Sequence, residues 1–140
     1  MIRTIASLIT IGLIFSAITA FPSDSKKEAA ALFAANKWLA LIDNEKYAES
    51  WKEASELFRD TVQRQLWEKS LKAVREPMGK LISRKVKTQI YKTTLPGAPD
   101  GEYVIIQFKT SFENKKMAVK TVTPMMDKDG IWGVSGYYIK

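Results

Sequence analysis

The sequence predicts an α+β fold in which three N-terminal helices pack on a four-stranded antiparallel sheet, in a cone-like arrangement. Up to Pro77, apolar residues recur every three or four positions, which is the spacing of an amphipathic helix. After Gly79, apolar and polar residues alternate, and Val, Ile, Thr and aromatic residues become more frequent, as in strands. Because the helices precede the strands, we expect them to cover one face of an antiparallel meander.

Three helices are expected before the sheet. The first begins at a capping box in which Ser25 is the cap, and it extends to Ile42. The second covers residues 47–54. Ser55 can cap the third, which should continue until Pro77 because proline interrupts helical hydrogen bonding.

Four strands follow, separated by turn-forming segments. They are expected over residues 81–94, 103–112, 117–126 and 131–139. The loop over residues 95–101 contains two prolines and two glycines, which cannot join a ladder. Alternation in the first strand places four side chains on the helix-covered face: Arg84, Val86, Thr88 and Ile90.

The first twenty residues have the pattern of a secretory signal peptide. Arg3 precedes an apolar stretch, and Ala20 provides a small residue before a cleavage site. The alternative is a membrane anchor, but an apolar run of about fourteen residues is shorter than the roughly twenty that span a bilayer. We therefore expect a signal peptide over residues 1–20, a lead-in over 21–28 and one domain over 29–140, exported to the periplasm or the outside medium without a transmembrane segment.

The composition excludes several kinds of chemistry. With no cysteine and no histidine, the chain has no disulfide, thiolate metal site, thiol nucleophile or Ser-His system. We expect no catalytic residues, no metal and no cofactor. The formal net charge of +7 is compatible with anionic partners, but the chain contains no nucleic-acid-binding motif, so no nucleic acid is expected.

Four segments together resemble a known family. They are YAESW over residues 47–51, REPMG over 75–79, LPGAPDGEY over 95–103 and DGIWGVSGY over 129–137. In this order they are similar to the bacterial secreted family called domain of unknown function 4019. The resemblance covers nearly the whole chain from about residue 29 to 139, and it implies an envelope protein with a fold similar to the nuclear-transport-factor-2-like or cystatin-like proteins.

Two positions depart from that family pattern. Glu45 stands where glycine is expected, which argues against a positive-φ turn there. Lys120 stands where an acid is more usual, which weakens any role for an acidic group on that strand. The resemblance implies a fold and no mechanism.

Arg84 and the tryptophans are the candidate site residues. If Arg84 lies on the inner face, its guanidinium requires an internal carboxylate or a bound anion. Trp51, Trp67 and Trp132, with Trp38, either line a ligand pocket at the open end of a cone or belong to the core. A second set of cations is expected on the outer sheet face, either for solubility or for binding: Lys85, Lys87, Lys109 and Lys120.

Three functions remain open from the sequence. The first is a non-catalytic envelope module that binds an unknown small ligand or a protein partner. The second is a small cone-fold enzyme, such as a carboxylate- or tyrosine-dependent isomerase or hydrolase. The third is attachment of the basic sheet face to anionic envelope surfaces. A cleft that contains a carboxylate hydrogen-bonded to a tyrosine would favour the enzyme.

Overall fold

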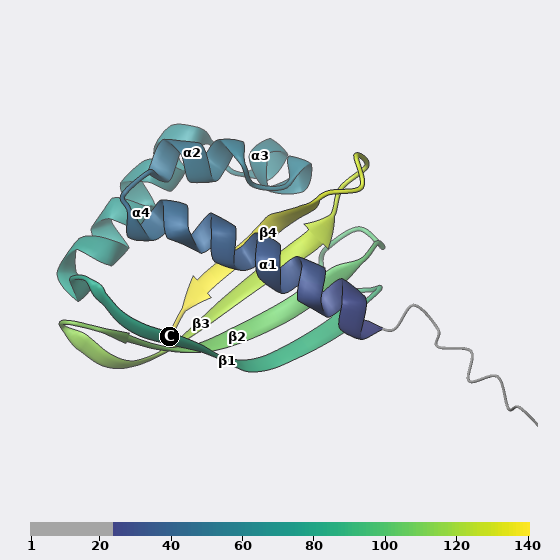
Figure 1. Ribbon diagram of the computed structural model, residues 1–140. Coiled ribbons are helices and arrows are strands. Elements are labelled where there is room, and N and C mark those ends of the chain that lie inside the picture. The colour runs from purple at the N-terminus through teal and green to yellow at the C-terminus, as the bar shows by residue number, and fades with distance from the viewer. Residues whose placement is uncertain (1–23) are drawn as a thin grey trace, which may run out of the picture.

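The computed structural model describes residues 24–140, which form four helices followed by four strands (Figure 1). The helices are α1 (Asp24–Asp43), α2 (Tyr47–Lys52), α3 (Glu56–Thr61) and α4 (Arg64–Met78). The strands are β1 (Leu81–Lys92), β2 (Tyr103–Phe112), β3 (Lys115–Met126) and β4 (Trp132–Ile139). The α+β class and the four antiparallel strands are confirmed. The predicted signal peptide lies outside the described residues.

The prediction of three helices is wrong, because the expected third helix is two helices. Ser55 does cap α3, since its hydroxyl accepts a hydrogen bond from the Phe58 N–H at 3.1 Å. Val62 and Gln63 then adopt extended backbone conformations and interrupt the helix. The Val62 carbonyl accepts a hydrogen bond from the Trp51 indole at 2.7 Å, so a tertiary contact holds the interruption in place.

The four strands form one open sheet in the order β1-β2-β3-β4, with every neighbouring pair antiparallel. The helices lie on one face of this sheet, and α1 crosses it diagonally (Figure 1). Apolar residues of α1 pack there against the inward side chains of the central strands. The most deeply buried of them are Ala35, Leu39, Ile42, Val104, Ile106 and Val122. No helix within residues 24–140 is both long and apolar enough to cross a membrane.

A pairing irregularity between Val86 and Thr88 changes the face that β1 presents. Before it, Arg84 pairs with Thr110 on the buried side of β2. Beyond it, Gln89 and Tyr91 take the helix-covered side, and Ile90 is 46% exposed. The predicted placing of Thr88 and Ile90 with Arg84 is therefore wrong, because one extra residue in a strand reverses the alternation that follows it.

Candidate functional site

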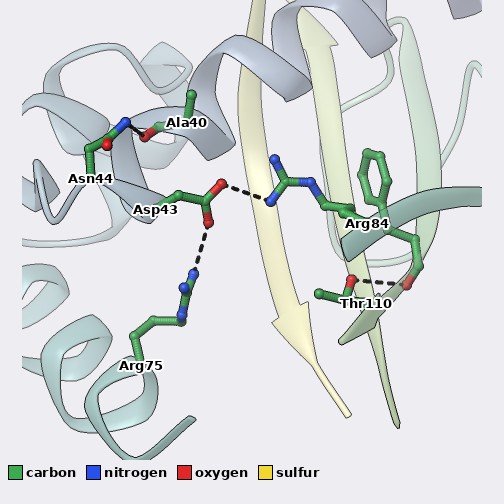
Figure 2. Close-up of polar contacts among 7 residues, drawn as sticks. Ala40, Asp43, Asn44, Arg75, Arg84 and Thr110 are labelled. Carbon is green, nitrogen blue, oxygen red and sulfur yellow. Dashed lines mark hydrogen bonds and ion pairs between the residues drawn. The ribbon is translucent and has the colours of Figure 1, made fainter. Parts of the chain in front are cut away.

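Three charged side chains from three elements meet at the end of α1 (Figure 2). Asp43 Oδ1 accepts a hydrogen bond from Arg75 Nη1 at 3.3 Å, and Asp43 Oδ2 accepts one from Arg84 Nη1 at 3.0 Å. The side chains of Asp43, Arg75 and Arg84 are 18%, 6% and 12% exposed. One carboxylate therefore joins α1, α4 and β1, and it is the internal partner of the candidate residue Arg84.

The end of α1 is set by a left-handed turn at Glu45, whose φ is 61°. The Glu45 N–H donates to the Ile42 carbonyl at 3.0 Å, and the Lys46 N–H donates to the Leu41 carbonyl at 2.8 Å. This pair of bonds is a Schellman motif. The expectation that a glutamate argues against a positive φ here is wrong, because the two bonds offset a cost of about 1 to 2 kcal/mol for the left-handed conformation. The turn ends α1 with Asp43 beside α4 and β1.

Lys120 lies on the inner face of β3, where it is fully buried. Its prediction as part of the outer basic face is wrong, and the register of the sheet explains why. Lys109 on the outer face is opposite Val119, so the next residue of β3 points inward. Lys120 is accordingly opposite the buried Phe108 of β2.

The Lys120 amine lies among aromatic rings and close to the two arginines. Its Nζ is 5.1 Å from the centre of the Phe112 ring and 5.6 Å from that of Tyr137. The Arg75 guanidinium carbon is 4.6 Å from the centre of the same Phe112 ring. Cation–π contacts of this kind stabilise a charge only partly. We refer to Asp43, Arg75, Arg84, Lys120 and Tyr137 as the interior ionic cluster.

Three buried polar atoms of this cluster have no hydrogen-bond partner among residues 24–140. They are Lys120 Nζ, Arg75 Nε and the Tyr137 hydroxyl oxygen. The last two belong to side chains that interact with each other, since a side-chain hydrogen bond with Arg75 lowers the pKa of Tyr137 against the effect of burial. Buried polar groups in proteins are nearly always hydrogen-bonded, because leaving one unpaired costs about 1 to 3 kcal/mol. Lys120 Nζ, which has no such interaction within the described part of the chain, therefore requires an explanation beyond packing.

The cluster carries an excess of positive charge, since Asp43 is its one acid beside Arg75, Arg84 and Lys120. Burial, together with the neighbouring Arg84 and Arg75, lowers the pKa of Lys120 to about 7 against the opposing effect of Asp43. Burial also raises the pKa of the Tyr137 hydroxyl to about 12. At neutral pH the tyrosine is thus a neutral donor, and the lysine amine is close to its titration midpoint.

A cleft of about 200 Å³ leads from solvent to the edge of the interior ionic cluster. Asp43 and Arg75 form part of its wall, together with the ring of Tyr47. Its other charged lining residues are Glu45, Glu76, Lys80 and Glu113. Two members of the cluster are therefore in contact with a space that is open to small molecules.

Of the predicted tryptophans, Trp67 contacts this cluster, because its ring packs edge-on against that of Tyr137 with the ring centres 5.7 Å apart. Trp67 is buried in the core, and its indole donates to the Ser50 hydroxyl at 3.0 Å. The Trp51 indole donates to the Val62 carbonyl, as described above. Both indoles are therefore held by internal acceptors, and neither residue lines the cleft beside Arg75.

Trp132 lies elsewhere, in a groove of about 540 Å³ between α1 and the turn that precedes β4. Phe33 and Ile131 line the same groove and are 74% and 65% exposed. Glu49 and Glu53 stand at this groove. The four candidate residues are thus divided. Trp132 lines the groove, Trp67 belongs to the aromatic core and Trp51 packs against it, and Arg84 is a member of the interior ionic cluster, which Trp67 contacts through Tyr137.

Sequence reasoning missed Asp43, Arg75 and Tyr137 as members of a site and placed Lys120 on the wrong face. Two signals could have corrected this. Lys120 alternates with the apolar Ala118 and Val122, which is the spacing of one strand face. Arg75 follows the buried Trp67 and Leu71 at intervals of four, which places it on the buried side of α4. Asp43 offers no such signal, because an aspartate at the end of a helix is ordinary.

The interior ionic cluster is rich in hydrogen-bond donors and positive charge. Its arginines, lysine and tyrosine supply hydrogen-bond donors of the kind that bind carboxylates and phosphates. Within residues 24–140, no group of three or more Asp or Glu side chains is placed to hold a metal ion. The arrangement can neutralise and orient a small anion.

Comparison with known proteins gives a family and nothing more specific. Residues 34–137 match the family described as "Protein of unknown function (DUF4019)". No curated protein and no solved structure matches the chain. Since the match covers well over half of the chain, this protein belongs to the DUF4019 family.

Proposed function

We propose that this protein is a non-catalytic binding module that takes a small carboxylate or phosphate at the interior ionic cluster. The observation that carries the proposal is Lys120, a fully buried lysine whose amine has no hydrogen-bond partner among residues 24–140. A binding role also agrees with the cone-like, nuclear-transport-factor-2-like fold that the family resemblance implies.

Charge balance supports an anionic ligand. A buried ammonium without a counter-ion is strongly unfavourable, so Lys120 either loses its proton or gains an anion. Asp43 is already shared between Arg75 and Arg84. A ligand with a negative charge would supply the second acid and would favour the protonated form of Lys120.

The size and position of the cleft limit the ligand. A volume of about 200 Å³ admits a small molecule, and Arg75 forms part of the wall. The Arg75 guanidinium and the Tyr137 hydroxyl, which interact with each other, are further donors in the cluster. The volume favours a compact ligand over an extended polymer. The wall of the cleft contains four acids and two cations and does not include Lys120, so the preference for an anion rests on the donors of the cluster and not on the charge of the cleft.

The alternative of a cone-fold enzyme finds less support. Tyr91 donates a hydrogen bond to Glu102 at 2.9 Å, and Lys27 pairs with the same carboxylate at 2.6 Å. This tyrosine–carboxylate pair joins α1 to β1 and lines neither the cleft at Arg75 nor the groove at Trp132. A structural role in holding these elements together explains the pair.

A thermal-shift series tests the proposed ligand class. Small carboxylates and inorganic phosphate should raise the melting temperature of the wild type. A ligand present at a hundred times its dissociation constant should raise the free energy of unfolding by about 2.7 kcal/mol. Lys120→Met should abolish the gain, whereas the exposed control Lys69→Met should keep it. The gain should also shrink as the pH rises above about 7, because the amine loses its proton.

Two results of this series would contradict the proposal. One is the absence of any stabilising compound in the screen. The other is an equal gain in the wild type and in Lys120→Met, since binding would then occur away from the interior ionic cluster.

We further propose that the protein is exported and that residues 1–20 are removed, because Arg3, the short apolar run and Ala20 form a signal-peptide pattern. N-terminal sequencing of the exported product should begin at or near Phe21. An intact Met1 on a membrane-embedded product would show instead that the segment is an anchor.

A further inference from the structure

We propose that the outer face of the sheet is a docking surface for an anionic phospholipid bilayer. This face contains a hollow of about 610 Å³ that is lined by five exposed lysines. The lysines are Lys85, Lys87, Lys109, Lys116 and Lys140. We call them the outer lysine face.

The register of the sheet places three of these lysines in one row that crosses β1, β2 and β3 and ends at the residue after β4. Lys85 of β1 is opposite Lys109 of β2, and Lys109 is opposite Val119 of β3. Val119 in turn exchanges two backbone hydrogen bonds with Lys140, at 2.9 and 3.0 Å. The row therefore reads Lys85, Lys109, Val119, Lys140.

Like charges directly opposite each other on neighbouring strands are destabilising, and the lining of this hollow contains no acidic side chain to offset Lys85 and Lys109. A solubilising surface normally mixes both signs of charge. The outer lysine face instead concentrates one sign around a concave area, which raises the local potential for an anionic partner.

The apolar residues of the same face distinguish a bilayer from a soluble polyanion. Met117 is 89% exposed and lies with Lys116 in the lining of the hollow, where Val119 adds further apolar surface. An exposed apolar side chain surrounded by lysines matches a surface that has phosphates outside and acyl chains beneath them. A soluble polyanion has no apolar layer in which the Met117 side chain could be buried.

The outer lysine face is separate from the interior ionic cluster. Lys109 and Phe108 are neighbours in β2 and point to opposite faces of the sheet, as do Val119 and Lys120 in β3. Changes at Lys85 or Lys109 should therefore leave anion binding at Lys120 intact. Failure of one proposal would not imply failure of the other.

Co-sedimentation with phospholipid vesicles tests this inference. The wild type and every variant are expressed from the full sequence and purified in the same way, so that they differ only at the substituted positions. The wild type should bind vesicles that contain phosphatidylglycerol, should not bind pure phosphatidylcholine vesicles, and should be released by salt. The double variant Lys85→Gln/Lys109→Gln should bind about thirtyfold more weakly, since each lysine near such a surface contributes about a factor of five.

The matched control removes the same charge from the helical side. Lys52 of α2 and Lys69 of α4 are exposed, and Lys52→Gln/Lys69→Gln should bind as the wild type does. Met117→Ser should weaken vesicle binding without changing the affinity for heparin, which is a soluble polyanion.

Three outcomes would overturn the inference. Equal loss of binding in the two double variants would mean that only net charge matters. Unchanged vesicle binding in Met117→Ser would mean that no side chain enters the bilayer. Tight binding to heparin with no binding to phosphatidylglycerol vesicles would assign the outer lysine face to a soluble polyanion.

Discussion

Replacing Lys120 with methionine should stabilise the protein most at low pH, and the advantage should shrink as the pH rises. The amine has a pKa of about 7 in the folded chain against 10.5 for a free lysine. Between these values the unfolded chain holds a proton that the folded chain lacks. Stability of the wild type therefore rises with pH across this window, by about 1.4 kcal/mol per pH unit from this one group. Below the folded pKa both states are protonated, so the full penalty is present.

The groups that face Lys120 come from every layer around it. Asp43 of α1 favours the ammonium, whereas Arg75 of α4 and Arg84 of β1 disfavour it, and the Tyr137 hydroxyl of β4 stays neutral throughout the window. None of these changes between wild type and Lys120→Met, so subtracting the two stability curves isolates the lysine.

Denaturant unfolding at several pH values from about 6 to 9, without added anions, measures this difference. The exposed control Lys69→Met should differ from the wild type by a small, constant amount. Parallel curves for the wild type and Lys120→Met would show that the amine is solvated or paired, and the anion-binding proposal would lose its main support.

Asp43→Asn should cause the largest loss of stability among the single substitutions considered. The change removes the acid that both Arg75 and Arg84 contact, and it leaves these two largely buried guanidinium groups without a counter-charge beside Lys120. Removing one partner of a buried ion pair costs about 3 to 5 kcal/mol, because the remaining charge is left uncompensated. Chemical denaturation of Asp43→Asn and of Asp60→Asn, an exposed control of the same type, measures the effect.

Two further variants separate charge from packing. Arg84→Met should lose less than Asp43→Asn, because Asp43 keeps Arg75 as a partner. At a pH low enough to protonate the Lys120 amine, adding Lys120→Met to Asp43→Asn should restore part of the lost stability, since it removes an uncompensated cation. If Asp43→Asn behaved like Asp60→Asn, Asp43 would have no electrostatic role in joining α1 to α4 and β1.

The sequence by itself determined the features that depend on local pattern. The change from a helical to a strand period near Gly79 predicted the α+β class, and the observed strand ends lie within two residues of those expected. Ser55 was recognisable as a helix cap, because capping involves residues only a few positions apart. The absence of cysteine and histidine likewise defined the available chemistry without any structure.

Only the tertiary structure decided how these elements register against one another. The interruption at Val62 is held by Trp51, which is eleven positions away in the chain. The face of Lys120 depends on its pairing with β2, and a shift of a single residue in a strand moves every side chain to the opposite face. Asp43 joins Arg75 and Arg84, which are 32 and 41 positions distant. Periodicity reports which residues share a face of one element, whereas a site built from three elements exists only once they have packed together.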